Sequence, residues 1–176
     1  MADRMCATYS LPGPKFVIAR WLQQLMEEQF GDPEAVLVPN GVDRLQFQAP
    51  ERSKQPIPTI GMLYGRQPWK GAETAFEAIR ILQRRHPDLR VVSFGRDSVA
   101  RRHQPPANFE FHVCPEQSEI PKLYSRADCW IVPSDSEGFG MPGIEAAACR
   151  CPLVVTRCGG PADFVEEGWN GHLVPV

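Results

Sequence analysis

The sequence lacks several features that would place a protein in a class at once. No apolar run approaches the ~20 residues that a membrane-spanning helix needs. The N-terminal stretch MADRMCATYSLPGPK does not have the apolar centre of a signal peptide. The net charge is only −2, so charge gives no reason to expect binding to nucleic acid or to an anionic membrane. These absences predict a cytoplasmic protein that binds no nucleic acid.

Two common signatures of phosphate and metal chemistry are missing as well. The sequence contains no G-x4-G-K-[ST] motif, which forms the phosphate-binding loop of many NTPases. It also contains no acidic pair of the D-x-D kind that would hold a metal ion. Any phosphate binding must therefore use another arrangement, and we predict no bound metal and no cofactor.

The six cysteines leave more than one interpretation open: Cys6, Cys114, Cys129, Cys149, Cys151 and Cys158. An even number permits disulfide bonds, but a cytoplasmic chain of this size favours reduced and mostly buried thiols. A metal cluster made of the last three is the other alternative. Its spacing matches no usual zinc pattern, in which paired ligands lie about two to four residues apart.

What the sequence does contain is a series of short apolar runs with helical patterns between them. With 176 residues, the chain is long enough for one domain with a sizeable core. The runs cover residues 35–39, 58–65, 90–95, 109–114, 129–134, 152–156 and 172–176. Helical patterns begin near residues 19, 70, 120, 141 and 161. Strands that alternate with helices predict an α/β fold with a parallel, doubly wound, Rossmann-like sheet.

Three polar loops directly follow such runs: GRQPWKG (65–71), GRDS (95–98) and EGFGMP (137–142). The carboxyl ends of parallel strands meet at one edge of a sheet, and ligands bind there. The three loops are therefore expected to lie together and to form a binding site. The proline-rich piece 48–58 is interpreted as an ordered connection or a hinge.

The third loop contains two glutamates, Glu137 and Glu145, separated by glycines and a proline. Pro142 suits the first turn of a helix, so backbone N–H groups near Gly140 and Met141, and near residues 143 and 144, are expected to face an anion. Carboxylates beside an anion suit hydrogen bonds from hydroxyl groups. A phosphate flanked by polyols describes a nucleotide sugar. The alternative is a simple turn with an ordinary acid in the first turn of the helix.

The first loop adds two cations, Arg66 and Lys70, between a strand and a helix. Arg66 offers a planar fork for a phosphate group, and Lys70 offers a point charge. Two solvated surface cations are the alternative. Their expected position beside the Glu137 loop favours a diphosphate.

At this point several motifs together resemble a known family. PNGVD (39–43) with Phe47, GRQPWKG, RADCWIVPS and EGFGMPGIEAAACRCPLVVTRCGGPADFVEEGWNGHLVP resemble the donor-binding, C-terminal half of GT-B glycosyltransferases of family four. The resemblance runs from about residue 18 to residue 176. Two positions depart from it: Arg96 stands where glycine is common, and Arg150 replaces glycine in ACRCP.

The resemblance implies a role for each matching residue. It assigns the donor diphosphate to Arg66 and Lys70, and the transferred sugar to Glu137 as the catalytic residue. Backbone N–H groups that meet sugar and phosphate are assigned to Phe139, Gly140 and Met141. The ribose diol is assigned to Glu145, and the base to the backbone around Val113 and Cys114.

The resemblance also implies a reaction and its partners. The family transfers a sugar, often a hexose, from a nucleoside-diphosphate sugar to a glycan, lipid or other acceptor, with retention and without metal. The acceptor domain is absent, so residues 1–176 are expected to form a single nucleotide-sugar-binding domain, with 1–17 as a candidate linker between domains. The chain alone is expected to be inactive. A glycan or lipid-linked acceptor would meet the missing domain, and the full-length protein would be a candidate for peripheral membrane association.

Two other interpretations stay open. The chain could be a nucleotide-sugar binding module without catalysis of its own. It could also be a GT-B relative such as a sugar epimerase or a phosphorylase.

Overall fold

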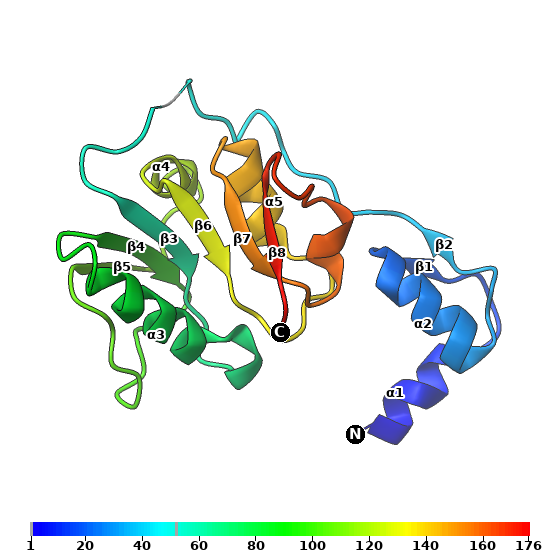
Figure 1. The fold of residues 1–176 in the computed structure, drawn as a ribbon. Helices are drawn as coiled ribbons and strands as arrows, with labels where there is room; N and C mark the ends of the chain where they lie inside the picture. The colour runs from blue at the N-terminus through cyan, green and yellow to red at the C-terminus, as the bar shows by residue number, and fades with distance from the viewer. Residues whose placement is uncertain (1, 52) are drawn as a thin grey trace.

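The computed structural model of the chain describes residues 2–51 and 53–176. Its main sheet has six parallel strands: β3 (Thr59–Leu63), β4 (Arg90–Gly95), β5 (Phe109–Val113), β6 (Cys129–Val132), β7 (Leu153–Thr156) and β8 (Gly171–Val174). Their order is β5-β4-β3-β6-β7-β8, so the order reverses between β3 and β6 (Figure 1). This order confirms the predicted doubly wound, Rossmann-like sheet.

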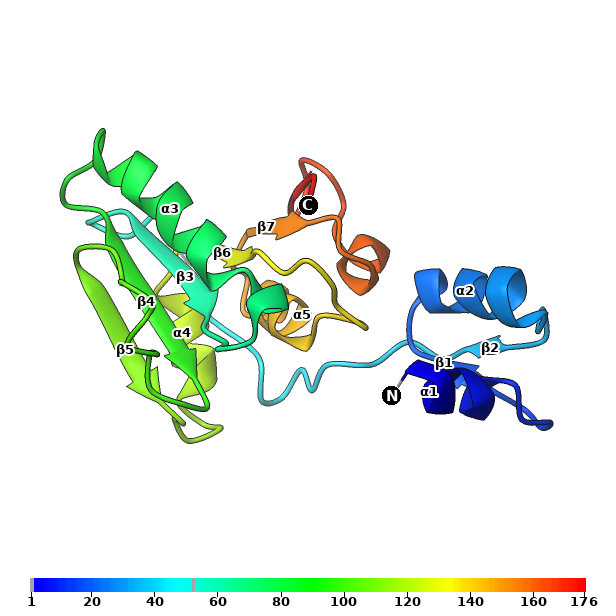
Figure 2. The same ribbon diagram turned by 90° about the horizontal axis from the view of Figure 1, so that it is seen from below.

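Helices cover both faces of the main sheet, as Figure 2 shows. Helix α3 (Ala72–Gln83) packs on one face, where Phe76 and Ile79 meet the β3 and β4 side chains. Helices α4 (Ile120–Ser125) and α5 (Met141–Ala148) pack on the other face. Buried strands with two covered faces have nearly continuous apolar sequences, which is why the apolar runs predicted them.

The helices differ in detail from the prediction. A short 3-10 helix, η1 (Pro68–Lys70), precedes α3, which ends at Gln83. Leu82, near the end of α3, is exposed. In place of the helix predicted after residue 161, the chain forms a single 3-10 turn, η2 (Gly160–Asp163).

Residues 2–38 form a small separate unit, which we call the N-terminal unit (Figure 1). It contains α1 (Ala2–Tyr9), β1 (Phe16–Val17), α2 (Arg20–Phe30) and β2 (Val36–Leu37). Strands β1 and β2 pair in parallel in a sheet of their own. The prediction that run 35–39 joins the main sheet is therefore wrong. The candidate linker, residues 1–17, includes α1 and β1, and its role between domains stays a prediction.

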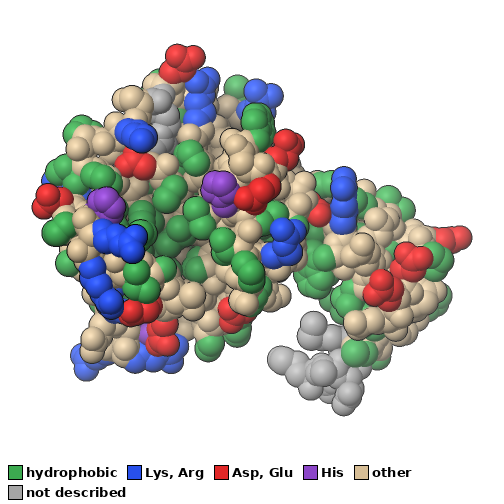
Figure 3. All heavy atoms as spheres, viewed as in Figure 1, with side chains coloured by type: hydrophobic (Ala, Val, Ile, Leu, Met, Phe, Trp, Pro, Cys, Tyr) green, Lys and Arg blue, Asp and Glu red, His purple; other side chains and the backbone are tan. Residues whose placement is uncertain are grey.

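The core of the N-terminal unit is small, with Val17, Met26 and Ala35 buried in it. Helix α2 contributes Met26 as its buried residue. Acidic and basic side chains are interspersed on the face seen in Figure 3, which agrees with the small net charge. Among the described residues, no helix is long and apolar enough to cross a bilayer.

Candidate functional site

The loops that follow β3 and β6 meet where the strand order of the main sheet reverses. We call them the Lys70 loop (residues 64–71) and the Glu137 loop (residues 133–140). Strands β3 and β6 are parallel neighbours, so both loops leave from the carboxyl edge of the sheet, where ligands bind in such folds. The Asp135 N–H donates to the Trp69 carbonyl at 2.8 Å. A Cβ on Gly71 would lie 1.9 Å from the Pro133 carbonyl oxygen, so this glycine allows the close approach of the two loops.

This contact brings a lysine of one loop against a glutamate of the other. Lys70 Nζ lies 2.7 Å from Glu137 Oε1, and the Ser134 hydroxyl donates to the same oxygen at 2.7 Å. The side chains of Lys70 and Glu137 are 27% and 12% exposed, so solvent screens this ion pair less than one on an open surface. The sequence predicted both residues at this edge, but it did not predict that they bind each other.

A pocket of about 500 Å³ opens beside Lys70 at the carboxyl ends of β3 and β4. Its lining includes the cations Arg66, Lys70 and Arg96, together with the acid Asp97. This excess of positive charge suits a diphosphate. Arg96, which stands where the resemblance leads one to expect glycine, therefore adds a positive charge to this pocket.

The guanidinium group of Arg66 is held at the rim of this pocket. Its Nε and Nη2 atoms donate to the Ser98 carbonyl at 3.0 and 2.8 Å, and Nη2 also donates to the Ser98 hydroxyl at 3.0 Å. Arg102 donates to the Arg66 carbonyl at 2.8 Å. Arg66 therefore has a defined position, which the sequence did not predict, and it keeps its positive charge next to the pocket.

Glu145 is half-buried and lies just past the first turn of α5, not within it as expected. Its Oε2 atom accepts a hydrogen bond of 2.7 Å from the Tyr124 hydroxyl, which comes from α4. Burial raises the pKa of the Glu145 carboxyl, although the hydrogen bond from Tyr124 acts in the opposite direction. A carboxylate held between two helices does not fit the alternative of a plain solvated acid at a helix start.

The start of α5 presents backbone N–H groups, but not all of those expected. Gly140 is the N-cap, with φ 90°. The N–H groups of Gly143 and Ile144 donate to the Gly140 carbonyl at 2.9 and 3.4 Å, so the expectation that they face a ligand is wrong. Among the described residues, the N–H groups of Phe139, Gly140 and Met141 have no protein acceptor. These three are free to donate to a ligand.

The two glycines of the Glu137 loop differ from each other in backbone conformation. Gly140 has a positive φ, whereas Gly138 does not, and a Cβ there would meet only the Ile18 side chain at 3.7 Å. The tight position lies on the next loop, where a Cβ on Gly160 would be 2.3 Å from the Phe139 Cα. Residues 138–143 read GFGMPG, a G-x-G-x-x-G spacing that opens a helix after a strand, and this signal could have strengthened the phosphate prediction.

Val113 and Cys114 lie at the carboxyl end of β5, on the same edge of the sheet. Strand β4 stands between β5 and β3, so both residues lie beyond the pocket as seen from Lys70. Val113 is exposed, and Cys114 adopts a positive φ of 45°. The Cys114 N–H donates to the Gly95 carbonyl at 2.7 Å, so of this residue's backbone polar groups the carbonyl is the one left to meet a base.

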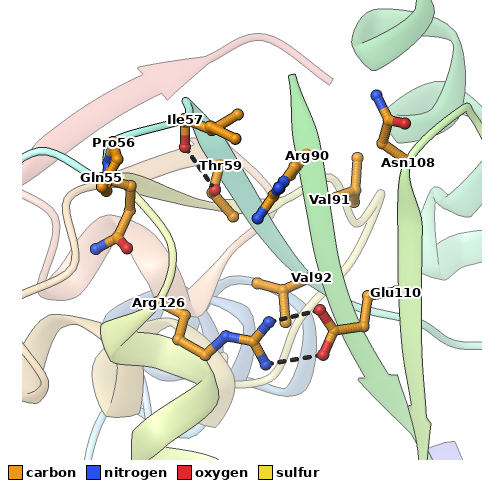
Figure 4. A pocket seen from close by; sticks show the side chains of 10 residues that line it. All are labelled: Gln55, Pro56, Ile57, Thr59, Arg90, Val91, Val92, Asn108, Glu110 and Arg126. Carbon is orange, nitrogen blue, oxygen red and sulfur yellow. Dashed lines mark hydrogen bonds and ion pairs between the residues drawn. The ribbon is translucent and has the colours of Figure 1, made fainter. Parts of the chain in front are cut away.

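A second pocket, of about 160 Å³, lies at the opposite edge of the sheet, at the amino ends of β3, β4 and β5 (Figure 4). The guanidinium of Arg126 binds both carboxylate oxygens of Glu110 there, with an Nη1–Oε1 distance of 2.8 Å. The hydrogen bond from Arg126 lowers the pKa of Glu110 to about 2. Arg126 and Glu110 are already paired with each other, and the pocket lies away from the ligand-binding edge, so it is not the candidate site.

Metal ligands and disulfides play no visible part at the site. Among the residues the structure describes, no group of three or more histidine, cysteine or acidic side chains could hold a metal ion. Cys6, Cys114, Cys129 and Cys158 have free thiols. Cys149 and Cys151 are buried, and the Cys151 thiol donates to the Ala127 carbonyl at 3.3 Å.

Comparison with known proteins agrees with this geometry. Residues 43–176 match the family model described as glycosyl transferases group 1. Glycogen synthase from Mycobacterium tuberculosis is 30% identical over 149 residues, which are 80% of this chain and 36% of that enzyme. The chain thus spans little more than a third of this relative.

Two solved structures share the fold. Sucrose-phosphate synthase from Thermosynechococcus elongatus superimposes with a TM-score of 0.80 at 21% identity, covering 97% of this chain and 47% of that one. Anabaena Alr3699/HepE, solved in complex with UDP and glucose, superimposes with a TM-score of 0.73 at 21% identity, covering 91% and 48% of the two chains. The chain therefore belongs to the glycosyl transferases group 1 family and has the Rossmann-like fold of one half of a GT-B enzyme.

Proposed function

We propose that this chain is the donor-binding domain of a retaining glycosyltransferase and binds a nucleoside-diphosphate sugar. The observation that carries the proposal is the ion pair between Lys70 and Glu137 at the reversal point of the sheet. It places a cation for phosphate and an acceptor for sugar hydroxyls side by side, each on a separate loop.

The residues of the candidate site can be assigned to the parts of such a donor. Lys70, Arg66 and Arg96 supply positive charge for the diphosphate, and the free N–H groups at the start of α5 add hydrogen-bond donors. Glu137 accepts from hydroxyls of the transferred sugar. Glu145 accepts from the ribose through its Oε1 atom, since Oε2 is bound to Tyr124.

Val113 and Cys114 then meet the base, because they lie at the strand end beyond the diphosphate. The structure of Anabaena Alr3699/HepE contains UDP and glucose, which supports uridine as the first base to test. We propose a hexose as the transferred sugar and a glycan or a lipid as the acceptor.

In the proposed reaction, the bond between the sugar anomeric carbon and the diphosphate oxygen breaks, and an acceptor hydroxyl forms the new bond on the same face while its proton passes to the leaving diphosphate oxygen. The leaving diphosphate carries the developing negative charge, and Lys70, Arg66 and the α5 N–H groups stabilise it without metal. Glu137 is the catalytic residue, through its contact with the sugar. Orientation of the acceptor contributes up to ~7–11 kcal/mol in such reactions. The acceptor-binding groups are proposed to lie outside this chain, so we expect binding by this chain without robust transfer.

A second candidate function is nucleotide-sugar binding without catalysis. It is favoured by a different observation, that the site residues described above all come from one edge of one sheet. Sugar release measured with and without an added acceptor separates binding alone from transfer and from hydrolysis or epimerisation.

The proposal predicts that one of UDP, GDP and ADP binds the chain, and that binding does not need metal. Calorimetry with the three nucleotides, each with and without EDTA, measures this. We expect the affinity to change by less than about twofold on chelation, because cationic side chains and backbone N–H groups take the place of a metal. Binding by none of the three, or binding that EDTA abolishes, would contradict the proposal.

Replacing Glu145 by glutamine is expected to weaken UDP binding by about threefold to tenfold, because glutamine keeps one oxygen acceptor but loses the charge. Its affinity for pyrophosphate, which has no ribose, should stay unchanged. Burial raises the pKa of Glu145, so its carboxyl binds a proton more tightly in the folded chain than in the unfolded chain. At neutral pH the ionised carboxylate therefore lowers the free energy of unfolding. The variant should therefore be at least as stable as the parent chain.

Glu166→Gln is the matched control, since Glu166 is exposed and follows the η2 turn. If Glu145→Gln weakens pyrophosphate and UDP equally, or leaves both unchanged, the ribose assignment is wrong.

A further inference from the structure

Trp21 reaches from the N-terminal unit onto the Glu137 loop. Its indole N–H donates to the Gly138 carbonyl at 3.0 Å. The ring also covers Gly159 of the following loop, where a Cβ would lie 2.8 Å from Trp21 Nε1 and 3.0 Å from Trp21 Cε2. The N-terminal unit therefore packs directly against the backbone next to Glu137.

A second contact seats the same helix. The Arg20 N–H, the first of α2, donates to Asp163 Oδ2 at 2.7 Å. The N-cap residue Ala19 provides no side-chain cap of its own. A carboxylate at a helix N-terminus is favourable both as a hydrogen-bond acceptor and against the helix dipole. Asp163 belongs to η2, so α2 is held by one contact after β6 and one after β7.

The two loops that α2 contacts are also bonded to each other. The Glu137 N–H donates to the Cys158 carbonyl at 2.8 Å, and the Gly160 N–H donates to the Glu137 carbonyl at 3.1 Å. Any movement of the N-terminal unit would therefore be transmitted to the backbone of Glu137 both through the Trp21–Gly138 contact and through the Arg20–Asp163 contact.

Because the peptide bond is planar, the Trp21 contact also affects the direction of the N–H group that follows Gly138. The described residues contain no cis peptide bonds, so the Gly138–Phe139 unit is a planar trans group. In such a group the carbonyl oxygen and the next N–H point in opposite directions. A donor that holds the Gly138 carbonyl on one side therefore aims the Phe139 N–H to the other side. That N–H is one of the three without a protein acceptor.

We propose that Trp21 is a positioning residue for the donor site, acting through the Gly138–Phe139 peptide. Seating of the N-terminal unit then sets the direction of the Phe139 N–H and with it the affinity for the donor. The inference rests on the proposed function, in which this N–H meets the sugar-phosphate part of the donor. It places a determinant of donor affinity outside residues 43–176, which the family model matches.

Trp21→Phe tests the inference because it keeps an aromatic ring and removes the N–H. Two measurements are made on the full chain: hydrogen exchange without nucleotide of the Glu137 and Gly160 amides, which are hydrogen-bonded between the two loops that α2 contacts, and affinity for UDP-glucose. Loss of one neutral hydrogen bond should speed exchange and weaken affinity by about threefold to tenfold each. Trp169→Phe is the matched control, because Trp169 is 79% exposed. Asp163→Ala releases the other contact of α2 and should act in the same direction.

The outcomes separate a positioning role from a structural one. A lower melting temperature for Trp21→Phe with unchanged exchange and unchanged affinity would show that Trp21 only stabilises the fold, and would overturn the proposal. If the parent chain binds no nucleoside diphosphate or its sugar, the proposed function fails instead. The exchange comparison then still decides whether Trp21 holds the Gly138–Phe139 peptide.

Discussion

Replacing Lys70 by methionine is expected to weaken binding of the nucleoside diphosphate by about tenfold to a hundredfold, since a hydrogen bond to a charged group contributes ~1.5–3 kcal/mol. Methionine keeps the unbranched stem, which packs where a Cβ on Gly65 would lie 2.8 Å from Lys70 Cγ. The change therefore removes the charge and leaves the shape of the loop nearly intact. Calorimetry with UDP, or with whichever nucleotide binds best, gives the loss directly.

The same substitution also leaves Glu137 without its cation. Glu137 is 12% exposed, between the open surface and the deep interior, so its unpaired charge should lower the free energy of unfolding by about 1–3 kcal/mol. Adding Glu137→Gln removes that unpaired charge. We expect the double variant to regain most of the stability but none of the affinity for the bare nucleotide.

Lys122→Met is the matched control, because Lys122 is an exposed lysine on α4, away from the Lys70 loop. Recovery of nucleotide affinity in the Lys70→Met, Glu137→Gln double variant would contradict the proposed role of Lys70. In that case the lysine would serve only to neutralise the glutamate.

The main sheet could be predicted because its central strands are buried on both faces and carry their signal locally. Strand β4 is an example, with buried residues at five successive positions from Val91 to Gly95. Adjacent loops followed from the same reasoning, since parallel strands place all their carboxyl ends at one edge. This is why Lys70 and Glu137, which are 67 residues apart, were expected at one site.

Other features could not be predicted, because a local sequence pattern does not show which distant segment it will contact. The run 35–39 looks like the other strands, yet it pairs with a two-residue strand near residue 16. Trp21 and Gly138 are 117 residues apart and belong to different units, so no spacing links them. Ser134 and Tyr124 bind the two glutamates from positions that carry no distinctive signal. A hydroxyl or a buried ring becomes a partner only when the fold brings it close.

Glycines show the same limit, because their importance depends on neighbours that are distant in sequence. Gly138 and Gly140 lie within the Glu137 loop itself, as the sequence shows. The structure instead places tighter glycine contacts with this loop at Gly71, which precedes α3, and at Gly160, which follows β7. Tolerance of a side chain at one of these glycines therefore depends on how the loops pack, and not on the local turn preference.

Replacing Gly160 by alanine is expected to disable the donor site while leaving the sheet folded. The added Cβ would lie 2.3 Å from the Phe139 Cα and 2.4 Å from the Gly138 carbonyl oxygen, so the backbone of the Glu137 loop must shift. Overpacking of this kind costs about 1–3 kcal/mol, which lowers the melting temperature of a domain of this size by roughly 2–12 °C. A shift of about 1 Å in groups that position a ligand can reduce function by about a hundredfold. We therefore expect affinity for the nucleotide sugar to fall by more than tenfold.

Gly41→Ala is the matched control, since a Cβ there would meet nothing within 4 Å and the residue does not have a positive φ. Far-ultraviolet circular dichroism should show an unchanged α/β spectrum for both variants, because the strands and helices lie outside the disturbed loop. The shift should act on the sugar more than on the nucleotide, because Phe139 is assigned to the sugar-phosphate end of the donor. Comparing UDP with UDP-glucose measures this difference. If Gly160→Ala loses affinity for UDP and UDP-glucose to the same extent, the Glu137 loop meets the diphosphate rather than the sugar, and the assignment of Glu137 must be revised.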